Sequence, residues 1–203
     1  MSPRSLFDHE EAHAANGRLF PAQASKQIEE RNASLLKRAA GGDLTVLTEA
    51  HSANDSALYR SVLHGLLEWA STSEANLRSL ASFVVKNSDL RGSAELAEAY
   101  TKLWQQRPDR QSTAQLLHLA ALSDDAKTFE GVVEAVTSNF ILEGCLDGIS
   151  LEELSALIES EYWVLSSAAR SAGAGFVLKQ KLTTVRERLT SASRNMESPN
   201  VES

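Results

Sequence analysis

The residue types best suited to chemistry stand in His9–His13, whose sequence His-Glu-Glu-Ala-His matches the H-E-x-x-H pattern of zinc peptidases. On a helix this spacing places both imidazoles on one face to bind zinc, with the first glutamate as general base. The surroundings argue against that chemistry. The segment lies in an arm bounded by Pro3 and Pro21, which leaves no room upstream for a substrate-binding sheet. We therefore interpret it as a solvated acidic segment and keep a zinc peptidase as a minor alternative.

Two further segments contain residue types found in active sites. Gly173 and Gly175 form a G-x-G pattern, but a helical pattern precedes it and a third glycine is missing, so it indicates close helix packing or a bend. Cys145 lies in a glycine-bounded loop with no histidine nearby in sequence, and we interpret it as a small packing residue. The sequence therefore predicts no catalytic residue, no metal and no cofactor.

Composition limits the class of protein. The 203 residues are 42% apolar and 23% charged, which is typical of one globular domain. A net charge of −7 disfavours general nucleic-acid binding over the whole surface. One cysteine excludes an intrachain disulfide and a cysteine zinc cluster. We find neither a signal-peptide pattern nor a membrane-spanning window, and we expect a cytoplasmic or nuclear protein.

The elements that would position these residues are helices, because apolar residues recur at spacings of three and four along most of the chain. Gly41-Gly42 and Pro108 are expected to end helices, because glycine favours a C-cap and proline removes a backbone donor. The expected helices cover residues 22–40, 43–50, 55–70, 74–86, 94–107, 111–122, 125–141 and 150–195. Short connections between them favour an all-α fold, either an antiparallel helical bundle or a short irregular α-solenoid, with a long C-terminal helix.

Local signals also predict where helices begin and which residues form the core. Asn54 or Asp55, Ser93 and Ser150 are expected N-caps, and Ser71 with Glu74 resembles a capping box. Aromatic residues in the helical stripes, including the three tryptophans, are expected mostly in the core. The side chains expected to be largely buried are those of Leu63, Leu67, Leu80, Tyr100, Trp104 and Val133.

The chain divides into three parts on these grounds. Residues 1–21 are expected to form a flexible arm that carries small apolar anchors at Leu6, Phe7, Leu19 and Phe20. Residues 22–195 are expected to form a single helical domain. Residues 196–203 are expected to be a disordered tail.

The candidate partner-binding element is the C-terminal seam, an apolar stripe that steps by four and three between residues 178 and 196. Its flanks are basic, which favours an acidic partner helix or an acidic groove. The residues assigned to partner binding are Leu178, Lys179, Lys181, Leu182, Val185, Arg186, Arg188 and Leu189. Packing of the seam on the chain's own bundle is the competing interpretation. A break near Gly173 and Gly175 would let it fold back, whereas a continuous helix from Ser150 would project it outward.

These observations favour a non-enzymatic helical adaptor or complex subunit that binds another protein. The first alternative is a nucleic-acid or ribonucleoprotein factor that uses the basic C-terminal helix. The second is a helical enzyme whose site the sequence does not reveal. A partner that is helical or acidic at the contact is expected, a homo-oligomer is left open, and a membrane partner is not expected.

Overall fold

A computed structural model of the chain describes residues 21–87, 89–143 and 149–171, together with Thr183, Thr184, Glu187, Thr190 and Ser191. The regular elements between residues 21 and 171 are α-helices, which confirms the all-α fold class. They are α2 (Pro21–Ala40), α3 (Thr45–Ser52), α4 (Ser56–Ala70), α5 (Glu74–Lys86), α6 (Ala94–Trp104), α7 (Arg110–Leu122), α8 (Ala126–Glu143), α9 (Leu151–Val164) and α10 (Ser167–Ser171).

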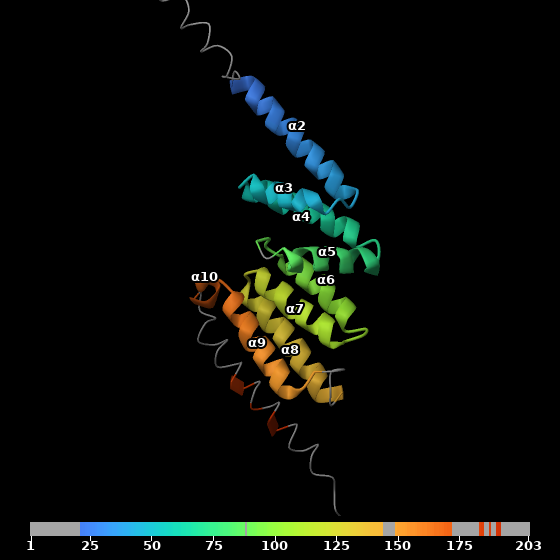
Figure 1. Cartoon of the computed structure of the whole chain (residues 1–203), viewed down its shortest axis with the longest axis vertical. Helices are drawn as coiled ribbons and strands as arrows, with labels where there is room; N and C mark the ends of the chain where they lie inside the picture. Colours follow the sequence, from blue (N-terminus) through green and yellow to red (C-terminus); the bar gives the residue numbers. More distant parts are fainter. Residues whose placement is uncertain are drawn as a thin grey trace, which may run out of the picture.

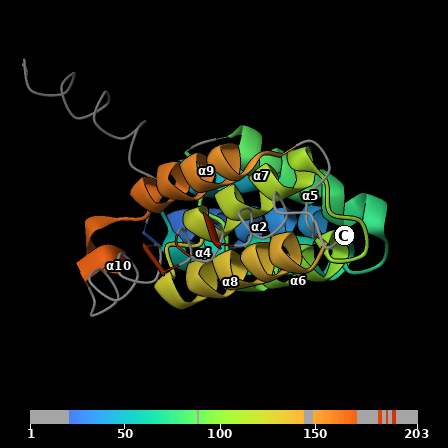
Figure 2. The ribbon, with the colours of Figure 1, turned by 90° about the horizontal axis from the view of Figure 1, so that it is seen from below.

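The helices stack in chain order along the long axis of the molecule (Figure 1). Helices α2 and α3 pack on α4, α4 packs on α5, and α5 packs on α6 and α7. Helix α7 then contacts α8 and α9. Seen from below, α8 and α9 lie in front of the earlier helices (Figure 2). The extensive contacts join helices no more than two positions apart in this order, as in a short irregular α-solenoid.

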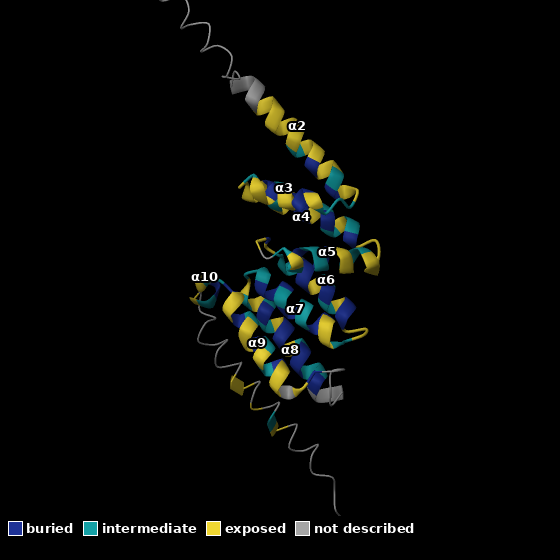
Figure 3. Ribbon diagram, viewed as in Figure 1, coloured by how far each residue is buried: buried dark blue, intermediate teal, exposed yellow. Residues whose placement is uncertain are grey.

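The buried apolar residues form one core cluster that includes residues from α2 to α10. The buried residues of these helices are dark blue in Figure 3. Trp104 is only 2% exposed, and its indole N–H donates to the Thr113 hydroxyl at 2.9 Å, so the buried donor is satisfied. Most of the expected core is confirmed, namely Leu63, Leu80, Tyr100, Trp104 and Val133. The expectation for Leu67 is wrong, because this side chain is only partly buried and lines a groove on the outer side of α4.

The predicted helix starts are confirmed at three positions and wrong at a fourth. Asp55, Ser93 and Ser150 cap α4, α6 and α9, the last with Glu153 in a capping box. Helix α5 is capped by Ser73, whose hydroxyl oxygen accepts from the Asn76 backbone N–H at 3.2 Å. Ser71 keeps helical dihedral angles and its hydroxyl donates to a carbonyl of α4, so it finishes that helix instead of starting the next.

Gly41 and Gly42 end α2 as expected. The Gly42 N–H donates to the Ala39 carbonyl and the Asp43 N–H to the Arg38 carbonyl, which is a Schellman pattern. Gly42 has a φ of +84°, and a Cβ there would lie 2.2 Å from the Trp69 ring. The position therefore requires glycine both for its backbone conformation and for the close approach of the indole.

Of the two alternatives for the C-terminal region, the continuous helix from Ser150 to Asn195 is wrong, because α9 ends at Val164. Leu165 has a ψ of 140°, which turns the chain out of the helix while its side chain stays buried. The Ser166 N–H donates to Asp124 Oδ1 at 2.8 Å, and the Ser166 hydroxyl oxygen accepts from Ala169 in α10. The break thus lies at Leu165–Ser166, ahead of the glycines where it was expected.

Helix α2 leaves the stack at its N-terminal end. Leu35 and Ala39 near its C-terminal end are buried, whereas Ile28 is 59% exposed. Arg38 anchors the C-terminal end to α3 through ion pairs with Asp43 and Glu49, both at 2.8 Å. Among the described helices, none is long and apolar enough to cross a membrane.

Candidate functional site

The sequence-predicted site residues lie largely outside the described residues. This applies to the eight assigned residues of the C-terminal seam (Leu178, Lys179, Lys181, Leu182, Val185, Arg186, Arg188 and Leu189), to His9–His13 and to Cys145. The five described residues between 183 and 191 are helical, and the Ser191 hydroxyl donates to the Glu187 carbonyl one turn earlier. Within the described part of the chain, no three His, Cys, Asp or Glu side chains are grouped to hold a metal ion.

An exposed apolar patch lies where α9 ends. Trp163 is 61% exposed and Val164 is 43% exposed, and we refer to these two residues as the α9 end patch. The expectation that Trp163 belongs to the core is wrong. Tyr162 lies one turn after Ile158 on the same face of α9, and both side chains are buried. Trp163 is the next residue, so its side chain is rotated by about 100° around the helix axis and leaves the buried face.

The α9 end patch is held in place by α10. The Arg170 guanidinium lies 5.0 Å from the centre of the Trp163 ring, and it also donates to the Trp163 carbonyl at 2.9 Å. Tyr162 contacts the same ring edge-on at a centroid distance of 5.3 Å. Cation–π and edge contacts of this kind fix an indole in one orientation. The tryptophan is therefore preorganised although its outer face is open.

Helix α9 is acidic along its length. It carries Glu152, Glu153, Glu159 and Glu161 and has no lysine or arginine. Two of these carboxylates bind neighbouring helices, since Glu153 pairs with Arg110 at 2.9 Å and Glu161 contacts His118 on α7. The last helix of the stack thus has the opposite charge to the C-terminal seam that follows it in sequence.

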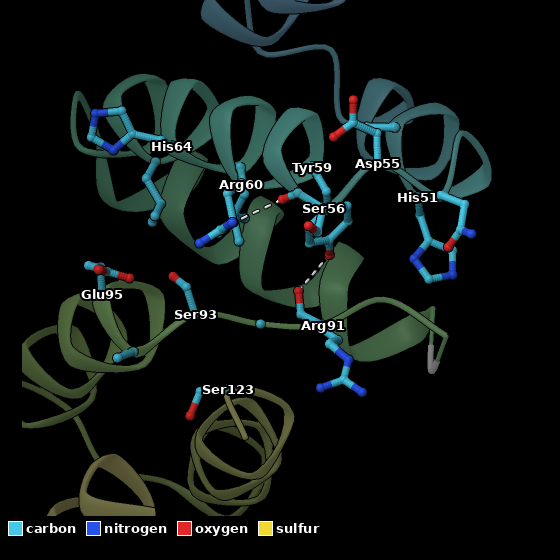
Figure 4. A pocket seen from close by; sticks show the side chains of 16 residues that line it. His51, Asp55, Ser56, Tyr59, Arg60, His64, Arg91, Ser93, Glu95 and Ser123 are labelled. Atoms are coloured by element: carbon cyan, nitrogen blue, oxygen red, sulfur yellow. Dashed lines mark hydrogen bonds between the residues drawn. The ribbon is translucent and has the colours of Figure 1, made fainter. Parts of the chain in front are cut away.

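A groove of about 630 Å³ separates α4 from the N-terminal end of α6 (Figure 4). We call it the α4–α6 groove. Leu63, Leu67 and Ala94 contribute its apolar surface. His64, Arg60 and Tyr59 approach it from α4, and Ser93 and Glu95 face them from the other side. His51 and Arg91 stand toward one end of the groove.

Tyr59 ties the two walls of the α4–α6 groove together. Its hydroxyl donates to the Arg91 carbonyl at 2.6 Å, which fixes the stretch that leads into α6. Burial of the phenol raises the pKa of Tyr59 to about 12, so the hydroxyl remains protonated at neutral pH. The Asp55 carboxylate accepts from the backbone N–H groups of Ala57 and Leu58, so its charge is engaged by the start of α4.

The basic side chains along the groove differ in their partners. The Arg91 guanidinium pairs with Asp124 Oδ2 at 3.2 Å. His64 pairs weakly with Glu68 at 3.5 Å on the outer face of α4. Arg60 donates through Nε to the Ser56 carbonyl and forms no ion pair with a carboxylate of the described residues. The groove therefore offers a guanidinium beside an apolar surface in a protein of net charge −7.

Arg60 and His64 are exposed on α4, and the sequence alone does not predict the groove beside them. The only signal was their four-residue spacing, which is equally typical of a solvated helix face. The opposite wall of the groove consists of residues 91–95, which follow α5 and begin α6. The two walls face each other only because α4, α5 and α6 stack, which a local pattern does not predict.

No protein-family model matches this chain, and neither a curated protein nor a solved structure matches it.

Proposed function

We propose that this chain is a non-enzymatic helical adaptor or complex subunit, which binds another protein through the C-terminal end of its helix stack. The observation that carries the proposal is the exposure of Trp163, at 61%, in the last turn of α9. The other two tryptophans are buried or partly buried, as is usual for this residue. Preorganised tryptophans on a surface are enriched among the residues that contribute most to binding at protein interfaces.

The C-terminal seam supports the same role. In sequence it begins at Leu178, beyond the end of α10 at Ser171 and beyond the break at Leu165–Ser166 that ends α9. The proposed docking surface comprises the α9 end patch together with the seam, whose basic flanks favour a partner that is acidic around an apolar contact. Cytoplasm or nucleus is the proposed location, since a chain with a single cysteine needs no oxidising compartment.

The test is affinity purification with the full-length chain from native lysate, followed by mass spectrometry of the recovered proteins. Trp163→Ala and the double variant Leu182→Asp with Leu189→Asp should each reduce recovery of the same partner. Ile28→Ala is the matched control, because Ile28 is also an exposed apolar residue but lies at the opposite end of the stack. Melting temperatures of all variants are measured in parallel.

Three outcomes would count against the proposal. Unchanged recovery with both variants would show that the α9 end patch and the seam do not dock a partner. A large drop in melting temperature for the double variant would mean that the seam packs on the chain's own acidic α9. Recovery of nucleic acid that weakens steeply with added salt would favour the ribonucleoprotein role of the basic segment.

A further inference from the structure

The N-terminal arm contains a sequence that the proposed function does not use. Leu6 and Phe7 form an apolar pair, and Asp8, Glu10 and Glu11 follow within four residues of it. A short segment of this kind combines an apolar anchor with concentrated negative charge. The metal interpretation of His9–His13 does not account for the apolar pair, whereas a docking role uses both parts of the segment.

The α4–α6 groove combines an apolar surface with the guanidinium groups of Arg60 and Arg91, and the carboxylates of Asp55 and Glu95 line it as well. Its apolar surface is supplied by Leu63, Leu67 and Ala94, and Leu67 is a leucine that the core leaves partly uncovered. Arg60 stands beside this surface without a carboxylate partner among the described residues, and Arg91 stands near one end. An occupant with apolar side chains and adjacent carboxylates would cover Leu67 and Ala94, and its carboxylates would pair with the Arg60 guanidinium, which has only the Ser56 carbonyl as a partner among the described residues.

We propose that the α4–α6 groove binds the chain's own N-terminal segment, residues 5–13. Leu6 and Phe7 cover Leu67 and Ala94, which the fold leaves partly exposed, and the acidic residues that follow them face Arg60 and Arg91. The arm thereby occupies an interaction surface of the same molecule. This inference concerns a different surface from the α9 end patch and is independent of the proposed function.

The length of the chain permits this docking. Helix α2 has 20 residues and is therefore about 30 Å long, and its C-terminal end packs on α4. Phe7 precedes Pro21 by 14 residues, which span up to about 46 Å when extended. The arm can therefore return along the whole of α2 and still reach α4.

Charge selects the arm over the other apolar segment outside the stack. Between residues 176 and 195 the chain carries five lysines and arginines against one glutamate, so this segment would bring like charge to Arg60 and Arg91. Tethering also favours the arm, because a docking segment on the same chain acts at an effective concentration of about millimolar. The acidic arm is therefore the occupant that the groove fits.

The experiment uses paramagnetic relaxation in the full-length chain. Cys145 is the only cysteine, so a Cys145→Ser, Ser5→Cys variant carries a nitroxide label at a single position beside Leu6. Amide spectra of the ¹⁵N-labelled protein should show selective loss of signal at Leu63, Ala94 and Glu95, which line the groove. Added Phe7→Asp should restore these signals, whereas Phe20→Asp, the matched change outside the docking segment, should leave them broadened.

A charge exchange tests the polar half of the contact. Arg60→Glu should reduce the broadening, and Glu10→Arg in the same chain should bring it back. A second measurement uses chains in which Cys145 is unchanged. The rate of trypsin cleavage after Arg4 is measured in the wild type and in Phe7→Asp. Docking predicts faster cleavage after Arg4 in the variant, with cleavage after Lys26 on α2 as the internal reference.

The outcomes decide the proposal. Groove amides that keep their intensity, together with an Arg4 cleavage rate that Phe7→Asp does not change, would overturn it. Broadening that appears only when spin-labelled chains are mixed with separate ¹⁵N-labelled chains would assign the groove to the arm of a second copy, and this also would overturn docking within one chain.

Discussion

His118 Nδ1 lies 2.7 Å from Glu161 Oε2 and joins α7 to α9 across the last layer of the stack. The two side chains are 23% and 13% exposed, so the contact is largely shielded from water. The hydrogen bond to Glu161 raises the pKa of His118 and outweighs the opposing effect of burial. The pair therefore stabilises the folded chain most when the imidazole is protonated.

The stability of the chain should consequently depend on pH through His118. The folded pKa lies above the unfolded value, so the contribution is fully present below the unfolded pKa and is lost as pH rises through the folded pKa. The stability of the wild type relative to His118→Gln should therefore be greater at low pH than at high pH. Urea unfolding at about pH 5.5 and about pH 8.5 measures this difference. An equal gap between the two proteins at both pH values would contradict the assignment.

Gly42→Ala should destabilise the chain strongly. A left-handed backbone costs a residue with a Cβ about 1–2 kcal/mol, and the new methyl group would overlap the Trp69 ring. We expect a loss of about 3 kcal/mol in the free energy of unfolding, measured with urea. Gly41→Ala is the control, since its Cβ would approach only a backbone oxygen at 3.4 Å. Equal stability of the two variants would show that the Gly42 backbone or the Trp69 ring lies elsewhere.

Two leucines on α4 should respond differently to truncation. Leu63 is buried, so Leu63→Ala should cost about 2–5 kcal/mol. Leu67→Ala should cost clearly less, because its side chain already borders the α4–α6 groove. Arg60→Ala on the exposed face should leave the melting temperature nearly unchanged. A larger loss for Leu67→Ala than for Leu63→Ala would mean that the orientation of α4 is wrong.

Asp124 should hold the turn after α9. Its Oδ1 accepts from the Ser166 N–H, and its φ of 54° is a conformation that aspartate and asparagine tolerate better than alanine. Asp124→Ala should destabilise by about 1–3 kcal/mol and speed hydrogen exchange at Ser166. Asp124→Asn keeps an amide oxygen as acceptor and should retain most of the protection. Slow exchange at Ser166 in Asp124→Ala would refute this role.

The parts of the fold that the sequence predicted are those set by near neighbours. Ser93 and Ser150 cap helices through contacts within three residues, so their roles are visible in a short window. Ser71 and Ser73 are two serines two residues apart, and either could cap α5 by residue type. Only Ser73 has the extended backbone of an N-cap, whereas Ser71 has helical dihedral angles, and the sequence does not specify this difference. The end of α9 depends on Asp124, which lies 42 residues earlier, so no local pattern could locate it.

The candidate sites were harder to predict for the same reason. The apolar spacing of α4 placed Leu63 and Leu67 in one stripe, and only the position of α6 leaves Leu67 at the edge of a groove. Trp163 and Tyr162 are adjacent aromatic residues, and contact with α7 decides which of them is buried. Burial at such positions is a property of the stacked helices, which a single helical pattern does not contain.

The Asp124 carboxylate connects the two surfaces described above. One oxygen holds Ser166 at the base of the α9 end patch, and the other pairs with Arg91 at the α4–α6 groove. An acidic occupant of the groove would compete with Asp124 for the Arg91 guanidinium. Once released from Arg91, the Asp124 carboxylate would accept more strongly from the Ser166 N–H, because its negative charge would no longer be neutralised by an ion pair. Binding at the groove and binding at the end of α9 would then be thermodynamically linked, each changing the affinity of the other by the same factor. A double-mutant cycle of Arg91→Ala and Trp163→Ala on partner affinity would measure the size of that linkage.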